Sequence, residues 1–237
     1  VLYFPEPLDA VKPNWGATTT GQRTSNYSWS GGYVQINGSA KTFNSTPIKE
    51  AAKRGDRLFR TVSSVPFKSG DYIEIQLQDT AAKTLFNHLY SEDPGNTDKV
   101  ISPSRIVLPA RVVEVKPSGT GSIVRIDRPL RLDIHLEWNP TVARIEYAVT
   151  RSGLERLTFE FPPVQWNGEF KELGYNAIVL RSAKDCWVRN LHLHNAEGGI
   201  FCGARNSTVA DIVFTNNKPP FTKNLYLTKK GCQGHHG

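Results

Sequence analysis

Apolar residues recur at a fixed spacing in the last third of the chain. The segments 154–161 (LERLTFEF), 188–195 (VRNLHLHN) and 209–216 (VADIVFTN) align without gaps. Their apolar residues coincide at the first, fourth and sixth positions, and Val188 and Val209 are 21 residues apart. The intervening strands agree, because Ile178 and Ile200 are equivalent and 22 residues apart. Such a period is typical of solenoids, in which each coil buries its apolar residues against its neighbours.

This repeat predicts an all-β protein with a parallel β-helix (solenoid) in its carboxy-terminal part. Leucine-rich repeats are the main rival, but they need a Leu-x-x-Leu-x-Leu pattern and a helical return segment. The sequence matches that pattern only in fragments and offers no return helix. We further expect Asn195 and Asn216 to stack in successive coils, where Asn side chains can bond one another and the bent backbone.

The first half of the chain has a different pattern. Residues 1–32 show almost no periodicity and predict an extended segment. Alternation over 72–78 (YIEIQLQ) predicts a half-buried strand, and 78–91 can hold a helical turn or two. Two hairpins are predicted, at 33–43 around Asn37-Gly38 and at 111–127 around a Gly-rich turn.

We therefore expect two regions along the chain. Residues 1–130 are predicted to form an extended segment and antiparallel hairpins that pack on the solenoid. Residues 131–237 are predicted to form the coils, which we expect to continue beyond the chain end. An open solenoid end is also a possible site of association, because unpaired strand edges invite pairing.

Composition narrows the class of protein. Hydrophobic residues make up 38% and charged residues 22%, so the chain has enough apolar residues for a core and shows no sign of disorder. No apolar run reaches the ~18 residues of a membrane span. The chain starts at Val1 without a leader, as expected of a mature or excised piece whose targeting segment is missing.

The formal net charge is +7. We expect no nucleic-acid partner, because the chain shows no basic helix, zinc-finger spacing or aromatic RNA-binding motif. A basic surface suits uronate or sulfated glycans, since exposed cations concentrate anionic polymers. An ordinary solvated basic face is the alternative.

Cysteines and sequons bear on the compartment. The three cysteines, Cys186, Cys202 and Cys232, could form one disulfide and leave one free thiol, or one of them could pair with a cysteine beyond Gly237. None of them has the spacing of a zinc site. Asn-X-Ser/Thr sequons are more frequent than the about two that chance predicts from this composition. They begin at Asn26, Asn37, Asn44 and Asn206, which are the predicted glycosylation sites. We expect a secreted protein.

Residues between the apolar positions of a strand point outward. Glu160 and His194 then occupy one outward column, where a carboxylate and an imidazole in adjacent coils can act as acid and base near neutral pH. His192 lies in the neighbouring column. The predicted substrate-binding residues are His192, Arg189 and Trp166, of which Trp166 lies in the longer connection after residue 161. The alternative is a set of surface side chains on a wet strand.

Two runs carry a family resemblance: 174–180 (GYNAIVL) followed by 185–191 (DCWVRNL), and the ending 234–237 (GHHG). They resemble the pectin-lyase-like superfamily, in particular its uncharacterised secreted β-helix proteins, over roughly 150–237. The resemblance implies a right-handed helix and an extracellular glycan context. It implies no specific reaction, because one fold hosts many functions.

The ending 231–237 (GCQGHHG) resembles the Gly-His-Gly element of polygalacturonase-type hydrolases, which makes His235 and His236 candidate catalytic residues. Those hydrolases also use a pair of Asp residues one coil earlier. Here that region has only Asp211, which departs from the two carboxylates that inverting hydrolysis needs. No carboxylate cluster for calcium is evident, and we expect no metal and no cofactor.

Two functions follow from these observations. The first is a secreted polysaccharide lyase or glycoside hydrolase that acts on an anionic polysaccharide. The second is a non-catalytic structural or glycan-binding component of an extracellular matrix, cell wall or surface appendage. Converging ionisable groups in one groove would favour the first, and scattered charges along a long contact face would favour the second.

Overall fold

A computed structural model describes residues 1–97, 105–168 and 170–218. It consists of two compact units, Val1–Ala40 with Tyr147–Gly237, and Lys41–Glu146. We call the first the parallel-sheet unit and the second the antiparallel unit. The structure thus divides the chain near residues 40 and 146, whereas the sequence led us to expect one division at 130.

The described residues are mainly strands, and their helices are short. The helical elements are α1 (Leu8–Val11), α2 (Thr84–Leu89) and the 3-10 turns η1 (Asn26–Ser28) and η2 (Leu136–Trp138). No helix in the described part is long and apolar enough to cross a membrane.

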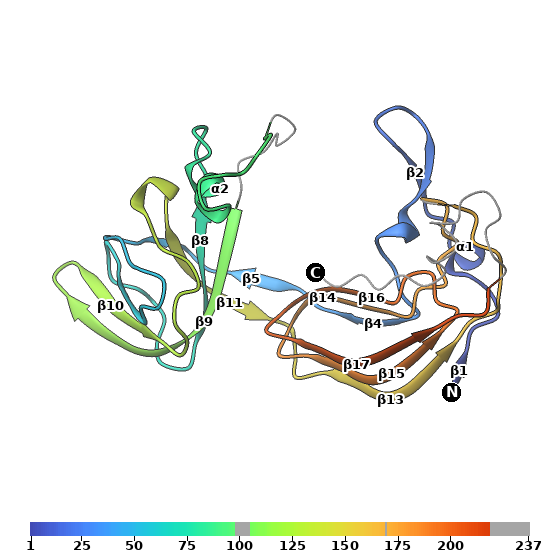
Figure 1. Ribbon diagram of the computed structural model, residues 1–237. Coiled ribbons are helices and arrows are strands. Elements are labelled where there is room, and N and C mark those ends of the chain that lie inside the picture. The colour runs from blue at the N-terminus through green and yellow to red at the C-terminus, as the bar shows by residue number, and fades with distance from the viewer. Residues whose placement is uncertain (98–104, 169, 219–237) are drawn as a thin grey trace. The chain divides into compact units, whose positions relative to one another are not determined.

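The parallel-sheet unit contains two parallel sheets (Figure 1). The first has the strand order β1 (Leu2–Tyr3), β13 (Gly153–Glu160), β15 (Trp187–His194), β17 (Thr208–Thr215). The second contains β12 (Val149–Thr150), β14 (Ile178–Lys184), β16 (Ile200–Arg205) and β4 (Val34–Asn37). From β13 to β17 the chain alternates between the two sheets, so each return adds a strand beside its predecessor.

The register of these strands confirms the alignment of the repeats. Val188 pairs with Leu154 on one side and with Val209 on the other. Leu191 and Leu193 pair in the same way with the fourth and sixth positions of the neighbouring segments. In the second sheet Ile178 pairs with Ile200. The 21- and 22-residue spacings therefore correspond to one complete passage through both sheets.

A left-handed residue at the same place in each strand explains why the apolar positions are the first and fourth. Arg156, Asn190 and Asp211 have φ of 58°, 54° and 54°. A strand normally alternates its faces, so the first and third residues would point inward. The left-handed residue bends the strand and shifts this alternation by one. A second set of such residues, Arg151, Asp185 and Asn206, precedes the same strands.

The core of this unit lies between the two parallel sheets. Phe159, Leu191 and Leu193 from the first sheet are at most 2% exposed, and Ile178 and Leu180 from the second are fully buried. Burying an aliphatic side chain of this size contributes about 1.5–3 kcal/mol, so the shared core holds the sheets together.

The side chain of Asn195 connects three passes of the chain. Its Nδ2 donates to the Phe161 carbonyl at 3.0 Å, and its Oδ1 accepts from the Asn217 N–H at 2.9 Å. The side chain is 1% exposed and φ is 58°. The expected bonds to bent backbone are present, and each goes to a main-chain group of a neighbouring pass.

The amino-terminal segment packs on the parallel sheets. Its short strands β2 (Trp15–Ala17) and β3 (Arg23–Ser25) form an antiparallel hairpin. The Asp9 N–H donates to the Leu173 carbonyl at 3.0 Å, and Ser25 Oγ donates to the Glu172 carbonyl at 2.6 Å. These bonds fix the extended segment that the sequence predicts for residues 1–32.

The predicted hairpin at 33–43 is wrong. Its first half, β4, pairs in parallel with β14, and Val34 lies beside Ile178. Its second half contributes to β5 (Ala40–Thr42), which belongs to the antiparallel sheet. Gly38 is needed for close approach instead of a turn, because a Cβ there would lie 2.6 Å from the Ser182 carbonyl oxygen.

The antiparallel unit is built on one sheet whose strands differ in length. Its strand order is β5, β11 (Thr141–Tyr147), β8 (Tyr72–Gln78), β9 (Arg105–Ser118), β10 (Gly121–Ile126), β7 (Leu58–Arg60), with β6 (Thr46–Pro47) paired to β11. The strand at 72–78, the hairpin β9–β10 and the helical turn α2 confirm three sequence predictions. Ile73, Ile75 and Leu77 are fully buried in the core of this unit.

Candidate functional site

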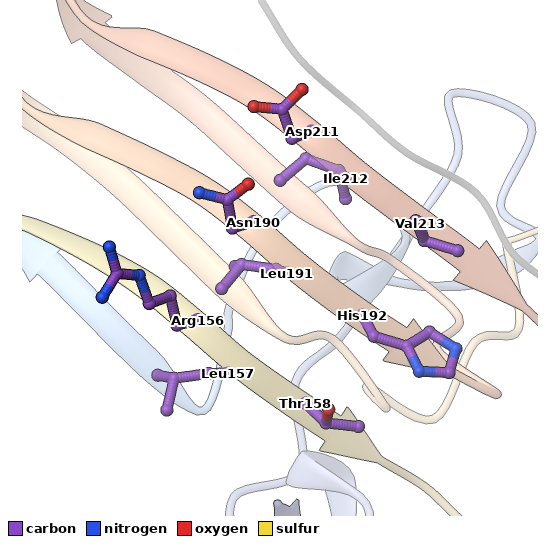
Figure 2. A pocket seen from close by; sticks show the side chains of 9 residues that line it. All are labelled: Arg156, Leu157, Thr158, Asn190, Leu191, His192, Asp211, Ile212 and Val213. Carbon is purple, nitrogen blue, oxygen red and sulfur yellow. The ribbon is translucent and has the colours of Figure 1, made fainter.

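The outward face of β13, β15 and β17 is hollowed into an open groove of about 540 Å³. Figure 2 shows its lining as three rows that cross the three strands. The rows are Arg156, Asn190 and Asp211; Leu157, Leu191 and Ile212; and Thr158, His192 and Val213. The middle row belongs to the core or packs against it, and the other two rows carry the outward side chains.

The bend in each strand produces this hollow. Arg156, Asn190 and Asp211 sit at the left-handed positions, all three are exposed, and Figure 2 shows them in line across the strands. Neighbouring strands are about 4.8 Å apart, so a guanidinium, an amide and a carboxylate follow one another at that spacing. Hydrogen-bonding groups of this kind suit a chain-like polar ligand that lies across the strands.

Two histidines share one hydroxyl at the end of the groove. His192 Nε2 lies 2.6 Å and His194 Nδ1 lies 2.7 Å from Thr215 Oγ1. The two imidazole centroids are 6.0 Å apart. Thr215 was not a predicted site residue, although the repeat alignment places it in the same column as His194.

Glu160 and His194 occupy paired positions in adjacent strands, as the repeat alignment predicts. Glu160 is exposed and His194 is half-buried. The recorded hydrogen bond of His194 goes to Thr215 on its other side. The structure thus brings the predicted carboxylate and imidazole into neighbouring positions, and their catalytic role stays a prediction.

Arg189 lies on the same outward face and is held by an ion pair. Its Nε lies 2.6 Å from Glu155 Oε2, and the two side chains are 51% and 35% exposed. An exposed pair of this kind contributes about 0–1 kcal/mol, so an anionic ligand can compete for the guanidinium at little cost.

Trp166 does not lie where a sugar ring could stack on it. The side chain is 5% exposed, and its Nε1 donates to Glu172 Oε1 at 3.3 Å. Because the ring is buried within the long connection after β13, the prediction that Trp166 binds substrate is wrong. His235 and His236 fall outside the described residues.

The predicted glycosylation sites differ in accessibility. Asn37, Asn44 and Asn206 are exposed. Asn26 is partly buried, and its Nδ2 donates to Asn14 Oδ1 at 2.9 Å, so this amide is engaged within the fold. Modification at each of these positions stays a prediction.

Cysteine and metal chemistry are limited within the described ranges. Cys186 and Cys202 are both free thiols, and Cys232 lies outside these ranges. In the same ranges, no group of three or more His, Cys, Asp and Glu side chains is arranged to hold a metal ion.

A buried carboxylate anchors the loop that leads into β14. Glu197 Oε2 accepts from the backbone N–H groups of Gly174 at 2.7 Å and Tyr175 at 3.0 Å, and the residue is 5% exposed. Burial raises the pKa of Glu197 above its ordinary value of 4.5, and the charge of Glu172 adds to this. The Lys218 charge and the two backbone bonds act in the opposite direction.

The raised pKa of Glu197 predicts how stability depends on pH. The folded state keeps this proton at a pH where the unfolded state has lost it. The raised pKa of Glu197 therefore stabilises the folded state fully below pH 4.5. This contribution to the free energy of unfolding is lost as the pH rises through the folded pKa. Urea denaturation of wild type and Glu197→Gln across this range should show the difference in unfolding free energy falling by up to about 1.4 kcal/mol per pH unit. A pH-independent difference would contradict the assignment.

Comparisons with known proteins give structural neighbours alone. No family model matches the sequence. No curated protein matches it. The tailspike gp49 of Pseudomonas phage LKA1 is similar with a TM-score of 0.38 and 10% identity, covering 76% of this chain and 32% of that one.

Two further tailspikes are similar at the same level. Gp54 of Acinetobacter baumannii bacteriophage AP22, solved in complex with A. baumannii capsular saccharide, has a TM-score of 0.37 and 13% identity, covering 80% of this chain and 27% of that one. Gp61 of Pseudomonas phage phi297 has a TM-score of 0.36 and 11% identity, covering 77% and 36%. The chain thus spans about a third of the length of these proteins.

Proposed function

We propose that the two parallel sheets are coils of a right-handed β-helix and that the chain is a carbohydrate-active protein. An anionic polysaccharide lies across β13, β15 and β17 in the groove, and the protein acts outside the cell. The observation that supports this best is the in-register stacking of polar outward side chains across three strands, ending at two histidines on one hydroxyl.

The shared hydroxyl gives the two histidines complementary roles. Thr215 Oγ1 has one proton and two lone pairs, so it can donate to one imidazole while it accepts from the other. The imidazole that donates keeps its remaining nitrogen unprotonated, and the imidazole that accepts keeps an N–H on its remaining nitrogen. The neutral pair therefore presents one base and one acid, whichever way the chain of hydrogen bonds runs.

A base and an acid on one face are what uronate elimination requires. The base takes the proton from C5, and the C4–O bond breaks as the C4=C5 double bond forms. The acid protonates the leaving glycosidic oxygen and is reprotonated on its other nitrogen, because the proton taken from C5 is passed on through the Thr215 hydroxyl, so both imidazoles end neutral. Arg156 and Arg189 lie on the same face and can neutralise the uronate carboxylate. Thr215 relays the proton between the two imidazoles in this scheme.

The test is cleavage of uronate-containing and neutral polysaccharides by the purified chain, read by ultraviolet absorbance of unsaturated products and by reducing ends. His192→Ala and His194→Ala should each lower the rate about 100-fold or more. Thr215→Val should lower it less, and Thr215→Ser should restore it by keeping the hydroxyl. Lys53→Gln, which changes an exposed side chain of the antiparallel unit, is the control and should have no effect.

A non-catalytic glycan-binding role is the second candidate, and two observations favour it. Arg189 is already paired with Glu155, and Asp211 is the one carboxylate lining the described groove. Glycan binding without unsaturated products or new reducing ends would establish this second role. Absence of both binding and cleavage would overturn the proposed function.

A further inference from the structure

A second hollow, of about 520 Å³, lies at the amino-terminal hairpin of the parallel-sheet unit. It is lined by Trp15, Gln22, Arg23 and Lys171, and it shares no residue with the groove. Trp15 and Arg23 come from the two strands of the hairpin, β2 and β3, and Lys171 comes from the long connection between β13 and β14.

The indole of Trp15 is held in a fixed position. Its Nε1 donates to Asp9 Oδ2 at 3.0 Å, and Asp9 Oδ1 accepts from the Asn14 N–H at 3.2 Å. The guanidinium of Arg23 lies 4.3 Å from the centre of the Trp15 ring. This cation–aromatic contact orients Arg23, whose side chain stays exposed to solvent.

A backbone hydrogen bond brings the second cation to the hairpin. The Ser25 N–H, at the end of β3, donates to the Phe170 carbonyl at 2.7 Å, which places the neighbouring Lys171 beside the strand that contains Arg23. Lys171 and Arg23 are both exposed, so two cations meet at one hollow.

Phe170, which precedes Lys171 in the chain, packs against a second exposed aromatic ring. Trp29 and Phe170 are 50% and 38% exposed, and their ring centroids are 4.8 Å apart. Exposed apolar side chains that lie together mark interaction sites more often than scattered single ones do. The combination of indole faces and guanidinium or ammonium groups suits a ligand with both apolar C–H faces and negative charge.

We propose that this hollow binds an acidic oligosaccharide, with its carboxylate or sulfate groups on Arg23 and Lys171 and its sugar rings against the aromatic side chains. Gln22 supplies amide groups for sugar hydroxyls. The site does not depend on catalysis in the groove.

The test follows the indole N–H resonance of Trp15 in ¹⁵N-labelled full chain, assigned by its loss in Trp15→Phe. A short uronate oligosaccharide should shift this resonance in a saturable way, and a neutral oligosaccharide of equal length should not. Arg23→Gln and Lys171→Gln should each weaken binding about tenfold. Lys53→Gln, which removes one exposed charge from the antiparallel unit, is the matched control and should bind as wild type.

The outcomes separate this site from the groove. His192→Ala should leave the Trp15 titration unchanged, so loss of activity in the groove says nothing against the hollow. A Trp15 resonance that does not move with the uronate oligosaccharide would overturn the proposal. So would equal shifts with the neutral sugar, or shifts with a single-stranded oligonucleotide alone.

Discussion

Replacing Leu193 by alanine should lower the free energy of unfolding of the parallel-sheet unit by about 3 kcal/mol. Leu193 is fully buried in β15 and pairs with Phe159 on one side and Phe214 on the other. Truncation removes buried methyl groups and leaves a cavity between stacked strands that cannot collapse independently. Denaturant unfolding followed by circular dichroism measures the loss.

Val213→Ala is the matched control for this prediction. Val213 is 56% exposed on β17 and belongs to the outward row of the groove. Its truncation should change stability by less than about 0.5 kcal/mol. Equal losses for Leu193→Ala and Val213→Ala would mean that the inward and outward faces of the sheet have been assigned wrongly.

The second large effect is expected at Gly121 in the antiparallel unit. A Cβ at this position would lie 1.9 Å from the Thr61 carbonyl oxygen, a main-chain atom just after β7 that cannot move without disturbing the bridge between Thr61 and Ile48. Gly121→Ala should therefore cost about 3 kcal/mol or more, because overpacking against backbone forces the strands apart.

Gly119→Ala separates the steric effect from backbone strain. Gly119 lies in the same hairpin turn with φ of 60°, and a Cβ there meets nothing within 4 Å. Alanine at this position should cost about 1 kcal/mol, through its unfavourable left-handed conformation alone. A cost at Gly121 no greater than at Gly119 would contradict the close approach of Thr61.

The repeat made the register of the parallel sheets predictable. Each apolar position had a partner 21 or 22 residues away, and stacking is the arrangement that buries all of them at once. The same alignment predicts the outward columns, so Glu160, His192 and His194 can be placed on one face from the sequence alone. Thr215 and the row at Arg156 could have been found from the same columns.

Features outside the repeat were less predictable. The pattern at 33–43 indicates strands but not their partners, and β4 joins the parallel sheet because its apolar residues complete the core there. Trp166 lies in a connection of unique length, so nothing in the sequence indicated that Glu172 would accept from its indole and that the ring would be buried. The division of the chain near residue 146 has no marker in composition.

The proposed groove depends on coils that stack with Leu154, Val188 and Val209 in one column that packs on the core. Nuclear Overhauser effects between methyl groups in a selectively methyl-labelled, otherwise deuterated chain test this stacking most directly. Cross-peaks are expected from the Val188 methyls to both Leu154 and Val209, and from Leu191 to both Leu157 and Ile212. Methyl groups of Val188 that contact neither neighbour, or a direct contact between Leu154 and Val209, would contradict the stacking and remove the basis of the proposed groove.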